Sequence, residues 1–243
     1  MQFDPGVLPL HFASAMSAVL LLDLDHTLYP STVPTGGAVD ARIVRYIGEY
    51  LGLPQTEANA LRHELSMRYG TTLKGLEILH GVDRDHYCDF IQDVEDELMP
   101  PFDPALRKWL VAAGKKAPTY LFTNARRDWA DRCLTSLGLS DLLAEGETGT
   151  SASGGLRGIL DIGFMEWIGK PEAGAFAKVE RFIRGRHGDA RLIFVDDRLD
   201  NLEQARRQGW QTVWVRPHDE VSKQDPGHRK VDSLLELDLA EFL

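Results

Sequence analysis

The sequence predicts an α/β protein whose core is a Rossmann-like, doubly wound parallel sheet, with a small α-helical domain inserted after the first strand. Apolar runs over residues 18–22, 118–122 and 191–195 each end in polar residues. Strands buried on both faces read as continuous apolar runs, because helices cover both sides of a parallel sheet. Between about 32 and 100 the apolar residues recur at helical spacing instead. We therefore expect a core of residues 1–31 and 101–243 and a helical insertion of residues 32–100.

The first predicted strand, 18–22, is followed directly by Asp23-Leu24-Asp25-His26-Thr27. In open α/β sheets the chemistry collects just beyond the carboxyl ends of the strands. Where the chain turns there, Asp23 and Asp25 can converge on one reacting centre. Two carboxylates held that close are not both comfortably ionised, so one can act as nucleophile or metal ligand while the other carries a proton. The same residues would also suit a turn or a helix cap, because Asp and Thr oxygens accept backbone N–H bonds.

The predicted insertion contains three apolar helical stripes. They comprise Val39, Ile43, Ile47 and Leu51, then Leu61 and Leu65, and then Tyr87, Phe90, Ile91, Val94 and Leu98. Pro100-Pro101 marks the return to the core, because Asp103-Pro104 is a typical helix start. A bundle that serves only for packing would account for the stripes, although not for their placement directly after the first motif.

The second predicted strand, 118–122, ends in Thr123-Asn124, where a helix is expected to begin. A hydroxyl and nearby backbone N–H groups at such a position can hold a phosphate oxygen. Capping of the helix alone is the alternative for an isolated threonine.

Two further strand-end motifs contain charged residues. Lys170-Pro171 is expected to open a helix that buries Phe176, Val179, Phe182 and Ile183, although a lone lysine is usually a solvated surface charge. The run 191–195 ends in Asp196-Asp197, and Asn201 follows at the start of another predicted helix. Adjacent acids after a buried strand are costly unless a cation binds them, and oxygen ligands suit Mg²⁺.

Taken in order, these motifs resemble the haloacid dehalogenase superfamily of phosphotransferases. The resemblance covers about 18–31 and 101–216, and the insertion resembles the helical cap of the superfamily's first subclass. It implies a Mg²⁺-dependent phosphomonoesterase that forms an aspartyl phosphate. The residue roles that it implies are Asp23 as nucleophile, Asp25 as acid/base, Thr123 and Lys170 as phosphate binders with Asn124 beside them, and Asp197 as principal Mg²⁺ ligand next to Asp196. The carboxylate of Asp23 and the backbone carbonyl of Asp25 complete the implied metal ligands.

A finer resemblance is to the pyrimidine 5′-nucleotidase branch, which implies UMP or CMP as substrate. It rests on residues 23–30, 68–75, 121–125 and 194–197, with His26 standing where that branch commonly has Asn. Tyr69, Thr72 and Lys74 are the candidate substrate contacts in the cap, although packing within the cap would explain them equally well.

Other activities fit part of the pattern. A related phosphatase could act on pyridoxal phosphate or a sugar phosphate, and a phosphomutase would need the cap to hold a sugar phosphate and exclude water. A dehalogenase would lack the second aspartate, Asp25. A catalytically silent nucleotide-binding module would be expected to have lost at least one of Asp23, Asp25, Lys170 or Asp197.

Composition narrows the expected partners and location. The formal net charge is −10 and there is no basic run, which argues against nucleic-acid binding. Apolar stretches fall short of the roughly 18 residues of a membrane span, and the N-terminus lacks the basic start of a signal peptide. We expect a cytoplasmic monomer or homodimer that binds a small phosphorylated metabolite, in the first place a nucleoside monophosphate.

Three remaining features give structural predictions. Cys88 and Cys133 are expected to be reduced packing residues, because they fall on apolar helix faces and lack disulfide or metal spacing. Residues 146–155 read as a flexible loop, and they lack the Gly-Lys-Ser/Thr of a nucleotide P-loop. The tail 218–230 is expected to be exposed, and the leucine-rich end 231–243 to dock on the core.

Overall fold

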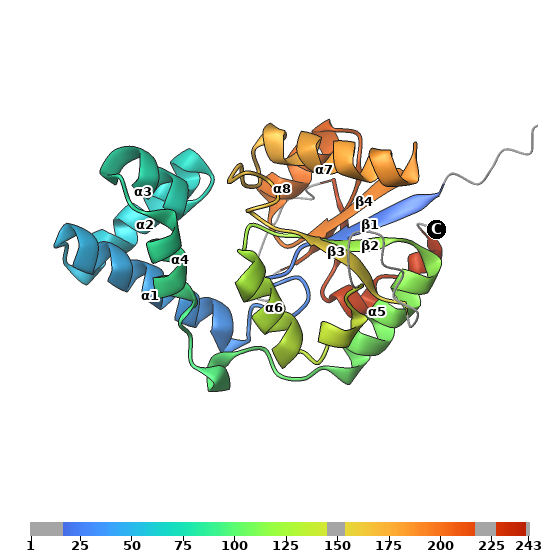
Figure 1. Ribbon diagram of the computed structural model, residues 1–243, viewed down its shortest axis with the longest axis horizontal. Helices are drawn as coiled ribbons and strands as arrows, with labels where there is room; N and C mark the ends of the chain where they lie inside the picture. Colours follow the sequence, from blue (N-terminus) through green and yellow to red (C-terminus); the bar gives the residue numbers. More distant parts are fainter. Residues whose placement is uncertain (1–16, 145–153, 217–226, 242–243) are drawn as a thin grey trace, which may run out of the picture.

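The computed structural model describes residues 17–144, 154–216 and 227–241. Its centre is a parallel sheet of six strands in the order β3-β2-β1-β4-β5-β6 (Figure 1). The strands are β1 (Ala18–Leu22), β2 (Thr119–Phe122), β3 (Leu156–Leu160), β4 (Arg191–Asp196), β5 (Gln211–Val215) and β6 (Arg229–Val231). The strand order reverses beside β1, which makes the carboxyl end of β1 the place where such sheets bind ligands.

Helices cover both faces of the sheet, as the continuous apolar strands predicted. In Figure 1, α7 (Ala173–His187) and α8 (Leu199–Arg207) lie on one face, and α5 (Pro104–Lys116) and α6 (Arg127–Ser136) lie on the other. All five residues of β1 are buried. Leu20 and Leu22 pack on the α5 and α6 side, whereas Val19 and Leu21 pack on the α7 and α8 side. The doubly wound α/β architecture is confirmed.

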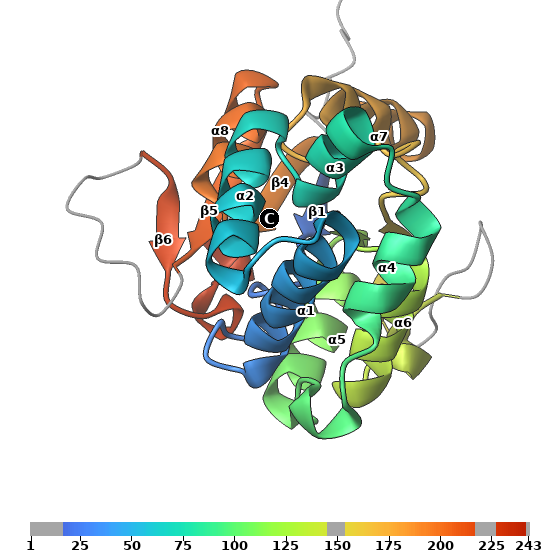
Figure 2. The same cartoon turned by 90° about the vertical axis from the view of Figure 1, so that its left-hand side faces the viewer.

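The insertion after β1 forms a separate helical unit with its own core (Figures 1 and 2). Its helices are α1 (Pro34–Leu51), α2 (Gln55–Tyr69), α3 (Thr72–His80) and α4 (Arg84–Gln92), here called the four-helix unit. Buried side chains from each helix meet in it, among them Ile47, Leu65, Leu76 and Tyr87. The unit lies beyond the carboxyl ends of the strands, over the end of β1.

The stripe predicted from Tyr87 to Leu98 is not one helix. Helix α4 ends at Gln92, and a short 3₁₀ turn follows at Asp96–Leu98. Val94 is buried in the core on the α5 and α6 side of the sheet, and Leu98 packs against that same core. The apolar spacing continued past the helix end because these residues contact a different partner, the sheet domain.

The prediction for Lys170-Pro171 was also wrong in its local structure. Strand β3 ends at Leu160, a turn over residues 161–168 follows, and α7 begins only at Ala173. The turn closes because Asp161 Oδ1 accepts from the Phe164 N–H at 2.8 Å. Lys170 therefore neither ends a strand nor opens a helix, and its peptide bond to Pro171 is cis.

The C-terminal part of the described chain docks on the α5 side of the sheet. Val231, Leu234, Leu237 and Leu239 are buried there, as expected for the leucine-rich end. Strand β6 begins at Arg229 and runs parallel to β5, so the last two residues of the stretch 218–230, which was expected to be an exposed tail, belong to the sheet. The predictions for residues 146–153 and 218–226 lie outside the described residues. Within the described part of the chain, no helix is both long and apolar enough to cross a membrane.

Candidate active site

The site is built at one edge of the sheet, where β1, β2 and β4 end. Leu22 pairs in register with Leu121 of β2 and with Val195 of β4, so the residues that follow them lie at the same edge. The N–H of Asp23 donates to the carbonyl of Val195 at 2.9 Å, which fixes the start of the first motif. Residues far apart in the sequence are brought together by this register.

Lys170 reaches this edge from the turn after β3 and is 1% exposed. Its Nζ donates to Asp23 Oδ1 at 2.7 Å, to Asp196 Oδ2 at 2.7 Å and to the carbonyl of Phe122 at 2.8 Å. Burial works to lower the pKa of Lys170, but the two carboxylates outweigh it and the pKa is raised. All three ammonium hydrogens are thus donated to protein acceptors, and Lys170 stays positively charged next to Asp23.

Thr123 and Asn124 make local contacts around this lysine. The Asn124 side chain brackets the Lys170 backbone, because Nδ2 donates to the Lys170 carbonyl at 2.8 Å and Oδ1 accepts from its N–H at 2.7 Å. Thr123 Oγ1 accepts from the Ala125 N–H at 3.0 Å, and α6 begins only at Arg127. Asn124 therefore acts as a positioning residue for Lys170, and Thr123 holds the turn that follows β2.

The carboxylates of Asp23, Asp196 and Asp197 lie within 4.8 Å of one another. Burial, opposed by Lys170, raises the pKa of Asp23 and that of Asp196 to about 6. Burial also raises the pKa of Asp197. When these three carboxylates are ionised, the single charge of Lys170 leaves the cluster at −2. An oxygen-only donor set with this charge fits Mg²⁺.

The two adjacent acids of the β4 end differ in their surroundings. Asp196 is fully buried and accepts from Lys170, from the Arg198 N–H at 2.8 Å and from Asn201 Nδ2 at 3.0 and 3.1 Å. Asp197 is partly exposed, and its Oδ2 lies 3.6 Å from Nδ1 of His26. Asp196 is therefore held by the protein interior, whereas Asp197 has oxygen capacity left for a cation.

Asp25 is held by two hydrogen-bond donors from outside this cluster. Its Oδ1 accepts from Nε1 of Trp129 at 3.0 Å and from the hydroxyl of Tyr29. Tyr29 reaches it because one helical turn follows Leu24, whose carbonyl accepts from the Leu28 N–H at 2.9 Å. Sequence reasoning missed both donors, although Tyr29 lies only four residues from Asp25. The two donors fix the orientation of a carboxylate that borders the cavity described below.

His26 adopts a left-handed backbone conformation, with φ at 63°. Its ring packs against Gly36 of α1 so closely that a Cβ at that glycine would lie 2.2 Å from Nε2. The neighbouring Asp197 carboxylate raises the pKa of His26. Gly36 is therefore a position where only glycine leaves room for the imidazole beside Asp197.

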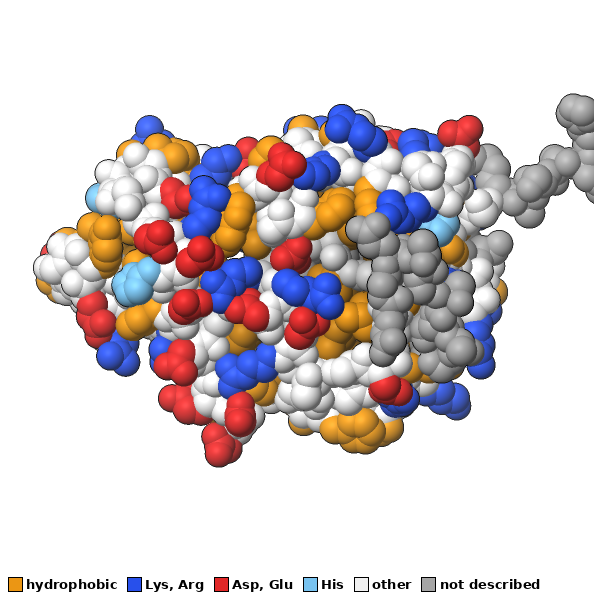
Figure 3. All heavy atoms as spheres, viewed as in Figure 1, with side chains coloured by type: hydrophobic (Ala, Val, Ile, Leu, Met, Phe, Trp, Pro, Cys, Tyr) orange, Lys and Arg blue, Asp and Glu red, His pale blue; other side chains and the backbone are white. Residues whose placement is uncertain are grey.

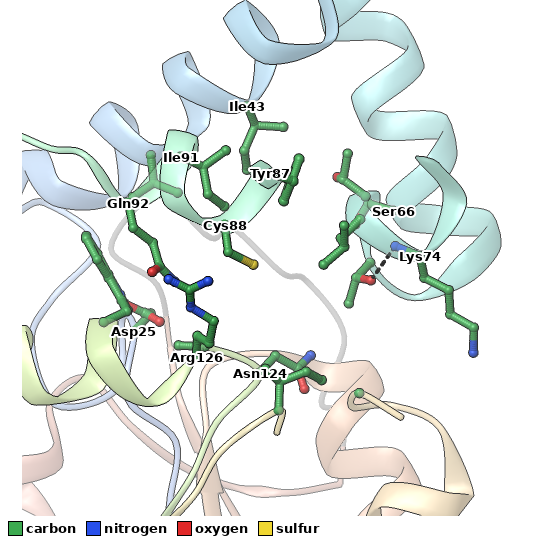
Figure 4. A pocket seen from close by; sticks show the side chains of 18 of the residues that line it. Asp25, Ile43, Ser66, Lys74, Tyr87, Cys88, Ile91, Gln92, Asn124 and Arg126 are labelled. Atoms are coloured by element: carbon green, nitrogen blue, oxygen red, sulfur yellow. Dashed lines mark hydrogen bonds between the residues drawn. The ribbon is translucent and has the colours of Figure 1, made fainter. Parts of the chain in front are cut away.

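A cavity of about 360 Å³ opens between this edge and the four-helix unit (Figure 4). Its size falls at the small end of the range for small-molecule sites. In Figure 4, Asp25, Asn124 and Arg126 of the sheet domain face Tyr87 and Cys88 of α4 across the open space. Other lining side chains are Ile43, Arg62, Ser66, Ile91, Gln92 and Trp167. Asp23, Thr123, Lys170 and Asp196 are buried, and the cavity is lined instead by their sequence neighbours Asp25, Asn124 and Gly169.

The structure separates the three candidate substrate contacts of the insertion. Thr72 and Lys74 line the cavity, but Tyr69 packs into the core of the four-helix unit with the Arg68 guanidinium 5.4 Å from its ring centroid. Lys74 forms an ion pair with Glu172 of the sheet domain, and in Figure 4 its side chain runs away from the other labelled residues. Thr72 Oγ1 donates to the Arg62 carbonyl at 3.4 Å.

Arg126 connects the two parts of the molecule beside the cavity. It follows β2 in the sequence and pairs with Asp89 of α4 at 2.5 Å and with Asp85 at 3.4 Å. Basic and acidic side chains lie next to one another over the middle of the face seen in Figure 3. The thiols of Cys88 and Cys133 are free and buried in the four-helix unit and under the sheet, as predicted.

Comparison with known proteins identifies the family. The haloacid dehalogenase-like hydrolase family matches residues 18–209, so the chain belongs to this family of hydrolases. It is 28% identical over 217 residues to phosphate metabolism protein 8 of Saccharomyces cerevisiae and 30% identical over 149 residues to enolase-phosphatase E1 of Nocardia farcinica. These matches cover 86% and 59% of this chain, and 64% and 55% of the respective relatives.

Solved structures support the fold. The HAD-hydrolase YfnB from Bacillus subtilis, solved with magnesium bound, matches with a TM-score of 0.55 at 16% identity. That match covers 90% of this chain and 96% of the other. A haloacid dehalogenase-like hydrolase from Burkholderia xenovorans gives a TM-score of 0.52 at 16% identity, covering 94% of this chain and 99% of that one.

Proposed function

We propose that the protein is a Mg²⁺-dependent phosphomonoesterase that works through an aspartyl phosphate on Asp23. The observation that carries this proposal is the pairing of the buried Asp23 with Lys170 next to two further carboxylates. A carboxylate whose charge is compensated in this way can approach a phosphate dianion. The hydrolase family of the chain agrees with the proposal.

Each residue of the site has a role in this reaction. An Asp23 oxygen attacks phosphorus and forms a P–O bond while the bond to the leaving oxygen breaks. Asp25 gives its proton to that leaving oxygen and later takes one from the water that hydrolyses the acyl phosphate. Asp23, Asp197 and the backbone carbonyl of Asp25 would hold Mg²⁺, which supplies positive charge to the phosphate oxygens. Trp129 and Tyr29 keep the Asp25 carboxylate in one orientation.

We further propose that residues 32–100 act as a cap over a core of residues 1–31 and 101–243. The four-helix unit supplies one wall of the cavity, and the sheet domain supplies the other. A cap in this place would exclude water while the leaving group departs. Thr72 borders the substrate in this proposal, and Lys74 joins the cap to the core through Glu172.

For the substrate we propose a pyrimidine 5′-monophosphate, UMP or CMP. Among the described residues, Arg62 lines the cavity and its Nε is buried without a hydrogen-bond partner. A buried donor of this kind is costly until an acceptor reaches it, and a ring carbonyl oxygen of a pyrimidine is such an acceptor. Ile43 and Ile91 provide apolar wall beside it.

Phosphate release from a panel of phosphorylated metabolites with Mg²⁺ tests the proposal. We expect UMP and CMP to be turned over best, with AMP and GMP poorer by at least roughly tenfold in kcat/KM, about 1.4 kcal/mol of transition-state binding. The variant Arg62→Lys keeps the charge and removes Nε, so it should lower kcat/KM for UMP more than for ribose 5-phosphate. Faster turnover of pyridoxal phosphate or a sugar phosphate than of both UMP and CMP would reject the proposed nucleotide substrate and leave the proposed phosphatase activity standing. No phosphate release from any ester would reject both.

A further inference from the structure

The turn between β3 and Lys170 holds two consecutive residues in the left-handed region. Glu166 has φ at 56° and Trp167 has φ at 63°. A residue with a side chain is disfavoured there, and such residues cluster at ligand sites. Backbone bonds impose the conformation, because the Glu166 N–H donates to Gly163 and the Trp167 N–H donates to Ile162, both at 2.9 Å. The turn therefore fixes the backbone from which the Trp167 side chain projects.

The Trp167 indole lies where the two parts of the molecule meet. It lines the same cavity as Asp25, and it packs partly on the α7 side of the sheet and partly on the four-helix unit. The guanidinium of Arg84, from α4, lies 4.8 Å from the ring centroid. Arg84 is itself held by Glu77 of α3, with Nε donating to Oε1 at 2.7 Å. One side of the ring is thus covered by a fixed cation, while the ring also borders the cavity.

We propose that Trp167 is a specificity-determining residue that stacks against a planar aromatic ring carried by the leaving group of the substrate, such as the base of a nucleoside. The inference rests on the proposed phosphomonoesterase function and adds the residue that recognises the leaving group. Aromatic stacking of one base strengthens binding roughly 5- to 150-fold and does not depend on which base is present. Trp167 accordingly selects for a flat ring, whereas the choice between rings belongs to hydrogen-bonding groups such as Arg62. Arg84 acts as a positioning residue that keeps the indole plane against the cavity.

The test compares UMP with ribose 5-phosphate, which carries a phosphate on the same sugar without the base. Trp167→Leu should lower kcat/KM for UMP about tenfold or more, within the range that stacking of one base supplies. Activity on ribose 5-phosphate should stay within about twofold, because no ring is lost from that complex. Trp167→Phe keeps a planar ring and should retain most of the activity on UMP. Trp167→Met, also apolar and not planar, replaces Trp167→Leu if the latter does not fold.

The outcomes separate this inference from the proposed function. Equal losses on the two substrates, or better turnover of ribose 5-phosphate than of UMP by the unmodified protein, would overturn the stacking role and leave the phosphatase standing. If the unmodified protein released no phosphate from either ester, the proposed function would fail, and equilibrium binding of uridine would decide the inference. Binding weakened by Trp167→Leu and kept by Trp167→Phe would support stacking, and no binding, or binding that Trp167→Leu leaves unchanged, would overturn it.

Discussion

Replacing Asp23 by Asn should abolish turnover and, at the same time, stabilise the metal-free protein. The amide cannot form an acyl phosphate, so the first chemical step is lost. The substitution keeps the size of the side chain, and the amide oxygen can still accept from Lys170, whose Nζ lies 2.7 Å from Asp23 Oδ1 in the unmodified protein. The change removes a buried negative charge that lies within 4.8 Å of the carboxylates of Asp196 and Asp197.

The size of the effect follows from the pKa of Asp23, which burial raises from 3.8 to about 6. A carboxyl group with a raised pKa in the folded state gains protons on folding, so folded-state stability falls as the pH rises from 3.8 through about 6. Above that window, a difference of about two pH units at 1.36 kcal/mol each corresponds to about 3 kcal/mol. Since 1 kcal/mol shifts Tm by about 2–4 °C at this chain length, we expect a rise of about 6–12 °C.

Thermal unfolding in excess chelator measures this directly, at neutral pH and near pH 5. The difference in Tm should shrink at the lower pH, because Asp23 of the unmodified protein is then largely protonated. Asp189→Asn is the matched control, since the Asp189 side chain is fully exposed, and it should leave Tm unchanged. A lower Tm for Asp23→Asn at neutral pH, or retained turnover, would refute the reasoning.

Three further predictions concern the metal, the proton donor and a buried thiol. Chelation should remove activity and Mg²⁺ should restore it. Asp197→Ala should lose Mg²⁺ affinity at little cost in Tm, whereas Asp196→Ala should lower Tm because alanine leaves the buried donors Lys170 Nζ, Asn201 Nδ2 and the Arg198 N–H without their acceptor; equal effects on Tm would argue against the distinction. Asp25→Ala should slow esters with poor leaving groups more than p-nitrophenyl phosphate, whose leaving group scarcely needs a proton, and a uniform loss would make Asp25 structural. Burial raises the pKa of Cys88 to about 12, so little of its thiol is ionised at pH values well below 12. N-ethylmaleimide should therefore modify Cys88 slowly in the folded protein and quickly after denaturation, and rapid labelling of the folded protein would contradict this.

The sequence predicted those parts of the site that depend only on where strands end. Continuous apolar runs marked β1, β2 and β4, and the carboxyl ends of parallel strands meet at one edge. Asp23, Thr123 and Asp196 could therefore be placed together in advance. Strands β3, β5 and β6 were missed because none of them is a continuous apolar run: β3 contains Arg157 and Gly158, β5 begins with Gln211-Thr212, and β6 begins with two basic residues.

Contacts between distant elements could not be predicted from local pattern. Lys74 pairs with a residue 98 positions further along the chain, and Trp129 reaches Asp25 across 104 positions. No spacing pattern in the sequence predicts either contact. The turn that contains Trp167 could not be predicted either. Its left-handed residues are not glycine, and its conformation is imposed by backbone hydrogen bonds to the preceding residues.

Two ion pairs that join the four-helix unit to the sheet domain are individually weak. Lys74–Glu172 and Arg126–Asp89 each include a carboxylate that is more than a third exposed, and pairs of this kind contribute about 0–1 kcal/mol. A substrate that contacts both walls of the cavity adds binding energy only when the two parts are together. Such a ligand shifts the equilibrium toward the arrangement in which the two parts are together. The size of the shift equals the difference between its binding free energies to that arrangement and to one in which the parts are separated. In the proposed cap arrangement, weak ion pairs between the two parts would therefore let substrate binding determine when the site closes.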